Sequence, residues 1–241
     1  MNIFELANPK RFMRFSAALL PWFWTIAVLC LGAGLYIGLF RVPPDYQQGQ
    51  TVKIMFIHVP AAWVGMMAYA SMAVASLFGL VNRHPLADAA AKAAAPLGAV
   101  FTALALITGS LWGKPMWGAY WVWDARLTSF LILFFLYLGY MALWSAIEDE
   151  TRAARACAIL ALVGAVNLPI IKYSVDWWNT LHQGESIFVK GGPLIAPVFL
   201  WPLFLMAFGY TFLFLALWMV RIRTEILARR ARTLQLRMGT A

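Results

Sequence analysis

Six long tracts without a charged side chain constrain the fold of this 241-residue sequence more than any other feature. A helix rises about 1.5 Å per residue, so about 20 apolar residues are needed to cross a bilayer. The fifth tract has only 16 residues, but Arg155 and Lys172 at its ends can extend outward to the membrane surface. The sequence therefore predicts an all-α integral membrane protein, in which residues 1–241 form one domain of six transmembrane helices. The predicted spans are residues 21–40, 60–81, 93–112, 127–147, 156–171 and 194–220.

The composition excludes most other classes of protein. Charged residues make up 12% of the chain and hydrophobic residues 63%, which is too little polar surface for a soluble enzyme or a disordered segment. Cys30 and Cys157 form no Cys-x-x-Cys pair, so thiol exchange and covalent attachment of a c-type haem to this chain are not expected. The net charge of +9 fits a cytoplasmic excess of basic residues in a membrane protein, so the expected surroundings are a lipid bilayer and no nucleic acid.

The basic residues predict the orientation of the six helices. If both termini lie on one side, that side carries thirteen Lys and Arg residues and the opposite side six. The positive-inside rule then predicts that both termini are cytoplasmic and that residues 221–241 form a basic cytoplasmic tail. We expect this tail to be a helical extension that contacts anionic lipids, with partner docking as the alternative. The six outer basic residues are Arg41, Lys53, Lys114, Arg126, Lys172 and Lys190.

The outer loop at residues 113–126 is unusually rich in tryptophan. Four of the twelve Trp residues lie within twelve positions from Trp112 to Trp123, more than an interfacial anchor needs. Trp117 and Trp121 are four positions apart, so they share a face if the segment forms a short surface helix. Such a face could hold a flat aromatic ligand. Asp124 could cap the next helix or accept indole N–H groups, and Arg126 could pair with a carboxylate.

Two of the three histidines are predicted on the same side as this loop. His58 precedes Pro60, which suits a first helical turn, and His182 lies in the outer loop 172–193, whereas His84 falls in a cytoplasmic turn. Two neutral imidazoles between apolar and aromatic walls suit a six-coordinate haem iron, and outer basic residues could meet its propionates. The alternative is two interfacial histidines with local hydrogen bonds. A zinc site lacks the usual ligand spacing.

The tryptophan-rich segment resembles the signature of a known family. The pattern W-G-x-x-W-x-W-D is matched at each fixed position from Trp117 to Asp124, and this is the signature of the WWD-motif family of haem-handling membrane proteins. Residues 57–63 and 181–184 resemble the two outer histidine segments of the same family. The six spans and the single histidine on each side of the signature resemble its smaller members rather than the larger cytochrome c synthetase subunits.

The resemblance implies a function in c-type cytochrome biogenesis at the inner membrane of bacteria. The protein would hold haem b transiently at the periplasmic face and deliver it to a membrane-anchored periplasmic haem chaperone. It would work with the ATPase and membrane subunits of an ABC-type transporter and with a small single-span subunit. It would bind and transfer haem without being an enzyme. The implied site consists of His58 and His182 as axial ligands, Trp117, Trp121 and Trp123 as the platform, Asp124 as the orienting acid and Arg126 as the propionate partner.

Two other functions would require different sequence features. A transporter that moves haem or another small molecule across the membrane would need polar groups at mid-membrane or broken paired helices, for which Asn167 and Pro169 are the only hint. We expect these two residues to shape the outer end of the fifth span instead. An electron-transfer cytochrome would need histidine pairs within its spans, and the predicted spans contain none.

Overall fold

The computed structural model describes residues 8–84, 86–182, 184 and 186–239, and almost all of them are helical or lie in short connections. Within these residues, six helical segments are long and apolar enough to cross a membrane, which confirms the predicted number. The α-helices are α1 (Pro9–Tyr36), α2 (Met55–Asn82), α3 (Ala87–Trp117), α4 (Ala125–Ala146), α5 (Glu150–Gly164), α6 (Asn167–Trp177) and α7 (Pro197–Gly239). A π-helical turn, η2 (Ile37–Arg41), extends α1, and a 3-10 helix, η3 (Gln50–Ile54), leads directly into α2.

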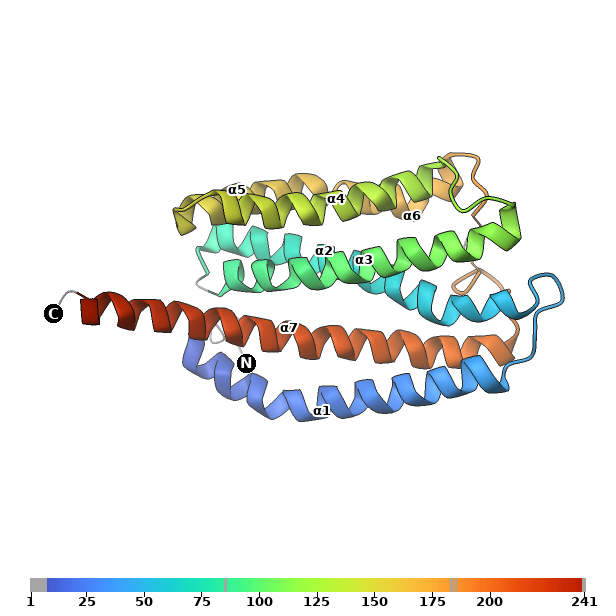
Figure 1. The fold of residues 1–241 in the computed structure, drawn as a ribbon, viewed down its shortest axis with the longest axis horizontal. Helices are drawn as coiled ribbons and strands as arrows, with labels where there is room; N and C mark the ends of the chain where they lie inside the picture. Colours follow the sequence, from blue (N-terminus) through green and yellow to red (C-terminus); the bar gives the residue numbers. More distant parts are fainter. Residues whose placement is uncertain (1–7, 85, 183, 185, 240–241) are drawn as a thin grey trace.

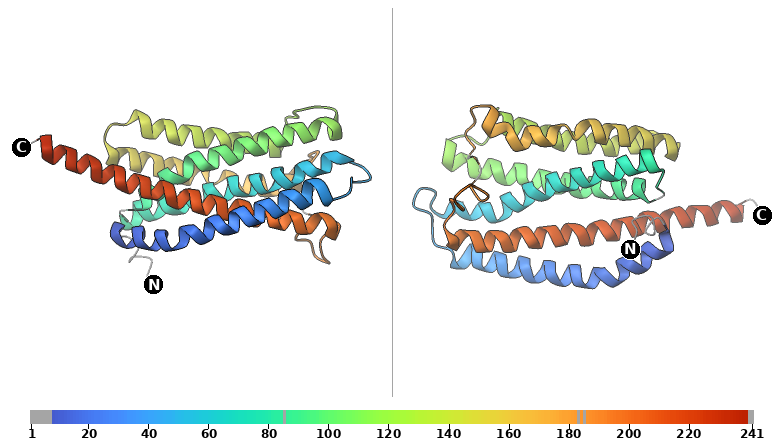
Figure 2. Two further views of the ribbon diagram at one scale, coloured as in Figure 1. Left: turned by 60° about the horizontal axis from the view of Figure 1, so that its bottom comes forward. Right: turned by 180° about the vertical axis from the view of Figure 1, so that it is seen from behind.

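The helices form three layers (Figures 1 and 2). α1 pairs with α7, α7 packs on α2 and α3, and these pack in turn on the layer of α4, α5 and α6. The start of α1 and the end of α7 lie at the same end of the bundle (Figure 1). The core is tightly filled around Phe56, Tyr69, Met72, Tyr137 and Phe214, whose side chains are fully buried.

The fifth span is not the single helix that the sequence predicted. α5 ends at Gly164 and α6 begins at Asn167, with a turn at residues 165–166 between them. Pro169 explains the position of this break, because a proline lacks the N–H and its ring clashes with the carbonyl of the residue four positions earlier, here Ala165. The amide of Asn167 is buried at the break and donates to the Ser129 carbonyl oxygen at 2.8 Å, so it fastens α6 to α4.

The helix ends also differ from the predicted limits. α3 continues to Trp117, so the irregular part of the tryptophan-rich loop shrinks to residues 118–124. α7 starts at Pro197 and runs unbroken through most of the predicted tail, for a length of about 64 Å. Residues 240–241 of that tail and residues 1–7 of the predicted domain lie outside the described residues. The limits of the spans within these helices and the single-domain organisation stay predictions.

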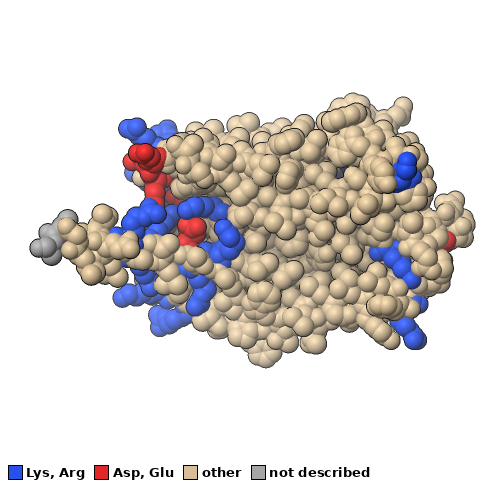
Figure 3. Space-filling model, in the orientation of Figure 1, with Lys and Arg blue, Asp and Glu red and all other residues tan. Residues whose placement is uncertain are grey.

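Charged side chains gather at the two ends of the bundle (Figure 3). The visible face between them carries almost none, as expected of a surface that faces lipid. The end with the chain termini holds the denser cluster, where Lys92 pairs with Glu225 at 2.9 Å and Arg232 pairs with Glu150. Arg223 donates to the Met13 carbonyl oxygen at 2.9 Å, which ties α7 to α1 at this end.

Candidate functional site

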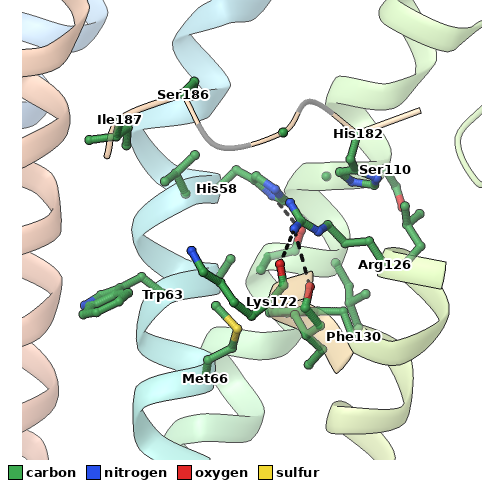
Figure 4. A pocket seen from close by; sticks show the side chains of 18 of the residues that line it. His58, Trp63, Met66, Ser110, Arg126, Phe130, Lys172, His182, Ser186 and Ile187 are labelled. Atoms are coloured by element: carbon green, nitrogen blue, oxygen red, sulfur yellow. Dashed lines mark hydrogen bonds between the residues drawn. The ribbon is translucent and has the colours of Figure 1, made fainter. Parts of the chain in front are cut away.

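A cavity of about 320 Å³ lies near the end of the bundle opposite the termini (Figure 4). Its walls are the first turns of α2, the last third of α3, the start of α4, the middle of α6 and the segment that follows α6. Most of the lining is apolar. The lining includes the side chains of His58, Trp63, Met66, Trp117, Trp121, Arg126, Lys172 and His182, together with Gly109, Ser186 and Ile187.

His58 enters the cavity from α2 rather than from the connection before it. The sequence placed this histidine just ahead of a helix at Pro60, but η3 and α2 form a continuous helical segment, so His58 is the fourth residue of α2. Its Nδ1 lies 3.0 Å from the Ala105 carbonyl oxygen and 3.2 Å from the Thr108 hydroxyl. The Trp112 ring packs edge-on against the imidazole, with the two ring centroids 5.7 Å apart. These contacts from α3 fix the orientation of the ring.

His182 enters the cavity from the segment after α6 and is held by Asp124. Its Nδ1 lies 3.0 Å from the Asp124 Oδ2, and its ring packs edge-on against Trp117 with centroids 4.8 Å apart. Asp124 is buried and its Oδ1 accepts the Leu127 N–H at 2.7 Å, so the same carboxylate caps α4. The capping role was one of the two expected for Asp124. Gln183, which belongs to the second histidine segment, lies outside the described residues.

The two histidines share one hydrogen-bonding arrangement. The carbonyl oxygen of Ala105 and the carboxylate of Asp124 can only accept, so Nδ1 of each imidazole carries the proton and donates. A neutral imidazole then has its lone pair on Nε2. Burial lowers the pKa of His182 below its usual value, although the hydrogen bond to Asp124 acts in the opposite direction. The lowered pKa favours the neutral ring at pH 7. Ligand histidines in metal sites are held in the same way, by a carbonyl or carboxylate on the second nitrogen.

The tryptophans are arranged differently from the expected surface helix. Trp117 is the last residue of α3 and Trp121 lies in the irregular segment 118–124, yet both line the cavity. The reversal of the chain depends on Gly118, whose φ of 75° is in the left-handed region that favours glycine. The Trp121 indole N–H is buried and has no acceptor among the described residues. Trp123 is 75% exposed, packs edge-on against the Trp121 ring, and is not among the residues that line the cavity.

Of the six outer basic residues, Arg126 and Lys172 line the cavity within the described part of the chain. Arg126 donates to the Lys172 and Ile171 carbonyl oxygens at 3.1 and 3.4 Å and to the Ser174 hydroxyl at 3.3 Å, as Figure 4 shows in part. The guanidinium therefore joins α4 to α6 at the cavity wall. Lys53 donates to the Leu39 carbonyl oxygen, and Lys114 donates to that of Gly118.

Several cavity residues were not among the candidates from sequence. Trp63 and Met66 line the wall, and Gly109 lets α3 approach the His58 ring. Helical spacing gave no signal for Trp63 and Met66, because they follow His58 by five and eight positions and so lie about 140° and 80° around α2 from it. No sequence signal pointed to Ala105 or Thr108, since the partners of His58 depend on how α3 packs.

The chain is similar to known proteins over nearly its whole length. The chain matches the model of the family described as "Heme exporter protein C" over residues 2–237. Proteins of the same description include one from Bradyrhizobium diazoefficiens, 60% identical over 98% of this chain and 89% of the relative. Another, from Paracoccus denitrificans, is 51% identical over the full length of both chains. One from Escherichia coli is 49% identical over 96% of this chain and 93% of the relative.

Proposed function

The chain belongs to the haem exporter protein C family, and from this we propose that it binds haem b at the outer, periplasmic face of the bacterial inner membrane and delivers it to a periplasmic haem chaperone. Membership confirms the resemblance that the tryptophan-rich signature indicated. In the proposed orientation, the end with the termini and the dense basic cluster is cytoplasmic and the cavity faces the periplasm.

The proposal rests on one observation, which is that the two histidines have the same hydrogen-bonding arrangement. His58 and His182 come from separate elements, line one cavity, and each donates from Nδ1 to a fixed acceptor. We assign the two Nε2 atoms as the axial ligands of the haem iron. Imidazole–iron bonds exchange without breaking a covalent bond, which suits a protein that must release its cargo.

The remaining cavity residues take supporting roles in this proposal. Trp117 and Trp121 would contact the haem macrocycle, and Asp124 orients His182. Arg126 has five N–H donors, so it can pair with a propionate while it holds α6. Trp123 lies outside the wall, so we assign it to the rim, where it supports Trp121.

The partners follow from the same proposal. A cavity at the outer end lets a membrane-anchored chaperone approach the haem edge, and ABC-type transporter subunits and a small single-span subunit complete the complex that releases the loaded chaperone. We propose a binding and transfer protein rather than an enzyme.

One observation favours a second candidate, a transporter subunit that moves haem or another small molecule across the membrane. The fifth span is broken at residues 165–166, and discontinuous helices line the substrate sites of many transporters. Between the break and the end of the bundle with the chain termini, however, the interior is filled by fully buried side chains such as Tyr69, Met72 and Tyr137. This packing favours capture at the outer face.

An absorption spectrum of the purified protein tests the ligand assignment. We expect a low-spin bis-histidine haem in the wild type, and loss or change of that spectrum in both His58→Ala and His182→Ala. His84→Ala is the matched control, because His84 is at the cytoplasmic end, where its Nδ1 accepts the Leu86 N–H at 3.3 Å. Normal spectra and normal chaperone loading in both test variants would refute the assignment. If the wild type takes up no haem even with its partners present, the transporter function becomes the better candidate.

A further inference from the structure

The cavity has an open side between α2 and α6. α5 packs against the inner half of α2, but after the break at residues 165–166 α6 packs against α4 and scarcely touches α2. The outer half of α2 is therefore uncovered on this side. This is the half that carries the cavity residues His58, Trp63 and Met66.

The open side reaches down into the apolar part of the bundle. Met66 is eight residues after His58, so the cavity wall extends about 12 Å along α2. Trp63 lies between His58 and Met66 along α2, lines the cavity and is 53% exposed. Both Trp63 and Met66 belong to the charge-free tract that starts at Pro60. At this depth the neighbour of an exposed side chain is a lipid acyl chain rather than water.

The outer end of the cavity is partly covered by the chain. Ser186 and Ile187, which follow His182 in the chain, lie across this end above His58 (Figure 4). Ile187 is partly buried and packs on the main core, so this segment is anchored to the bundle. A large planar ligand that approached from water would meet this segment first.

Lys172 places a positively charged side chain at the open side. Its side chain extends from α6 across the cavity toward the side where Trp63 stands (Figure 4). An ammonium group at this position favours a ligand with an acidic group, because opposite charges attract strongly where little water screens them. Arg126 is the second cation of the cavity wall and comes from the opposite side, at the start of α4.

We propose that the cavity is loaded sideways, from the outer leaflet of the bilayer, through the opening between α2 and α6, and that Lys172 captures a carboxylate of the entering ligand. The ligand class is a planar apolar ring that carries carboxylates, which resides in a leaflet with its ring among the acyl chains and its acids at the headgroups. The inference rests on the proposed haem function and adds the route of entry. Arg126 and Lys172 then supply one cation for each of two carboxylates.

The rate of loading from two sources tests this route. Apoprotein in nanodiscs is mixed either with phospholipid vesicles that contain haem or with haem bound to serum albumin, and the bis-histidine spectrum is followed with time. We expect Lys172→Ala to slow loading from vesicles about tenfold, since a lost charge acts mainly on association, and to slow loading from albumin by a clearly smaller factor. Lys172→Arg should restore the vesicle rate. Lys190→Ala is the matched control, because Lys190 is an exposed outer lysine that is not among the residues lining the cavity.

A photo-crosslinking amino acid at position 63 gives a second readout that does not depend on Lys172. In the apoprotein it should label lipid acyl chains, and haem supplied in vesicles should reduce that labelling. Position 201 is the control, because Trp201 is 71% exposed near the outer end of α7 and is not among the residues that line the cavity. Labelling there should not change with haem.

The outcomes separate the route from the function. If the wild type takes up haem from albumin but not from vesicles, or if Lys172→Ala slows both sources equally or neither, lateral entry is wrong and the proposed function stands. Unchanged labelling at position 63 would also contradict the route. If the wild type takes up haem from neither source, the proposed function itself fails.

Discussion

Asp124 makes two separable contacts, and substitutions can remove them one at a time. Its Oδ1 accepts the Leu127 N–H at 2.7 Å as the cap of α4, and its Oδ2 accepts the His182 Nδ1–H at 3.0 Å. Loss of a helix cap costs about 1 kcal/mol of stability. Loss of a partner that orients a ligand histidine lowers metal affinity about 10- to 100-fold, which corresponds to about 1.4 to 2.7 kcal/mol.

Three variants at this position should therefore behave differently. Asp124→Ser retains a cap but is too short to hold His182, so haem affinity should fall about 10- to 100-fold with little loss of stability. Asp124→Asn retains the capping oxygen, but an amide N–H at the second position favours the tautomer with the proton on His182 Nε2. The haem affinity of the asparagine variant should fall at least as far as that of the serine variant. Asp124→Ala should show the same loss of affinity and a further loss of about 1 kcal/mol in stability.

Haem titration of each apoprotein in nanodiscs gives the affinity, and the thermal midpoint in detergent gives the stability. The two measurements should separate, with the serine and asparagine variants losing affinity alone. If Asp124→Ser binds haem as tightly as the wild type, Asp124 is only a helix cap and the proposed orientation of His182 is wrong. If Asp124→Ala alone fails to accumulate in the membrane, the capping role of Asp124 dominates.

Three smaller changes test other parts of the structure. Gly109→Ala places a methyl group 2.9 Å from His58 Cε1, so the imidazole must shift and haem affinity should fall about tenfold in the same titration. Gly98→Ala places its Cβ against the buried Tyr137 ring, so overpacking should lower the free energy of unfolding by about 3 kcal/mol and the thermal midpoint with it. A normal midpoint would contradict the packing of α3 on α4. Trp123→Ala should change haem affinity less than threefold, because that ring is outside the cavity wall; a larger loss would return Trp123 to the binding surface.

Features of the fold that depend on apolar length could be predicted from the sequence. A bilayer requires about 20 apolar residues per helix whatever the neighbours are, so the charge-free tracts gave the correct number of long helices. Helix ends were less predictable, since Pro115 lies near the end of α3 without terminating it and η3 merges into α2. That merging is why His58 is a helical residue rather than part of the preceding loop.

The candidate site was predictable in its residue types and less so in its geometry. His58, His182, Trp117, Trp121 and Arg126 all line one cavity, although they come from three separate parts of the chain. Which oxygen each imidazole contacts depends on tertiary packing. A periodicity argument on Trp117 and Trp121 assumed a local helix, whereas the chain reverses at Gly118 and brings both rings to the cavity without one. Helical spacing could not have shown this.

Pro169 links the least predictable element of the fold to the cavity itself. After the break at residues 165–166, α6 packs against α4, and Trp63 on α2 is 53% exposed. The clash of the proline ring with the Ala165 carbonyl ends α5, and the hydrogen bond from Asn167 to Ser129 directs α6 to α4 instead. Arg126 then fixes the middle of α6 through its bonds to the Ile171 and Lys172 carbonyl oxygens. The break thus leaves a space beside the two histidines that is open on its membrane side.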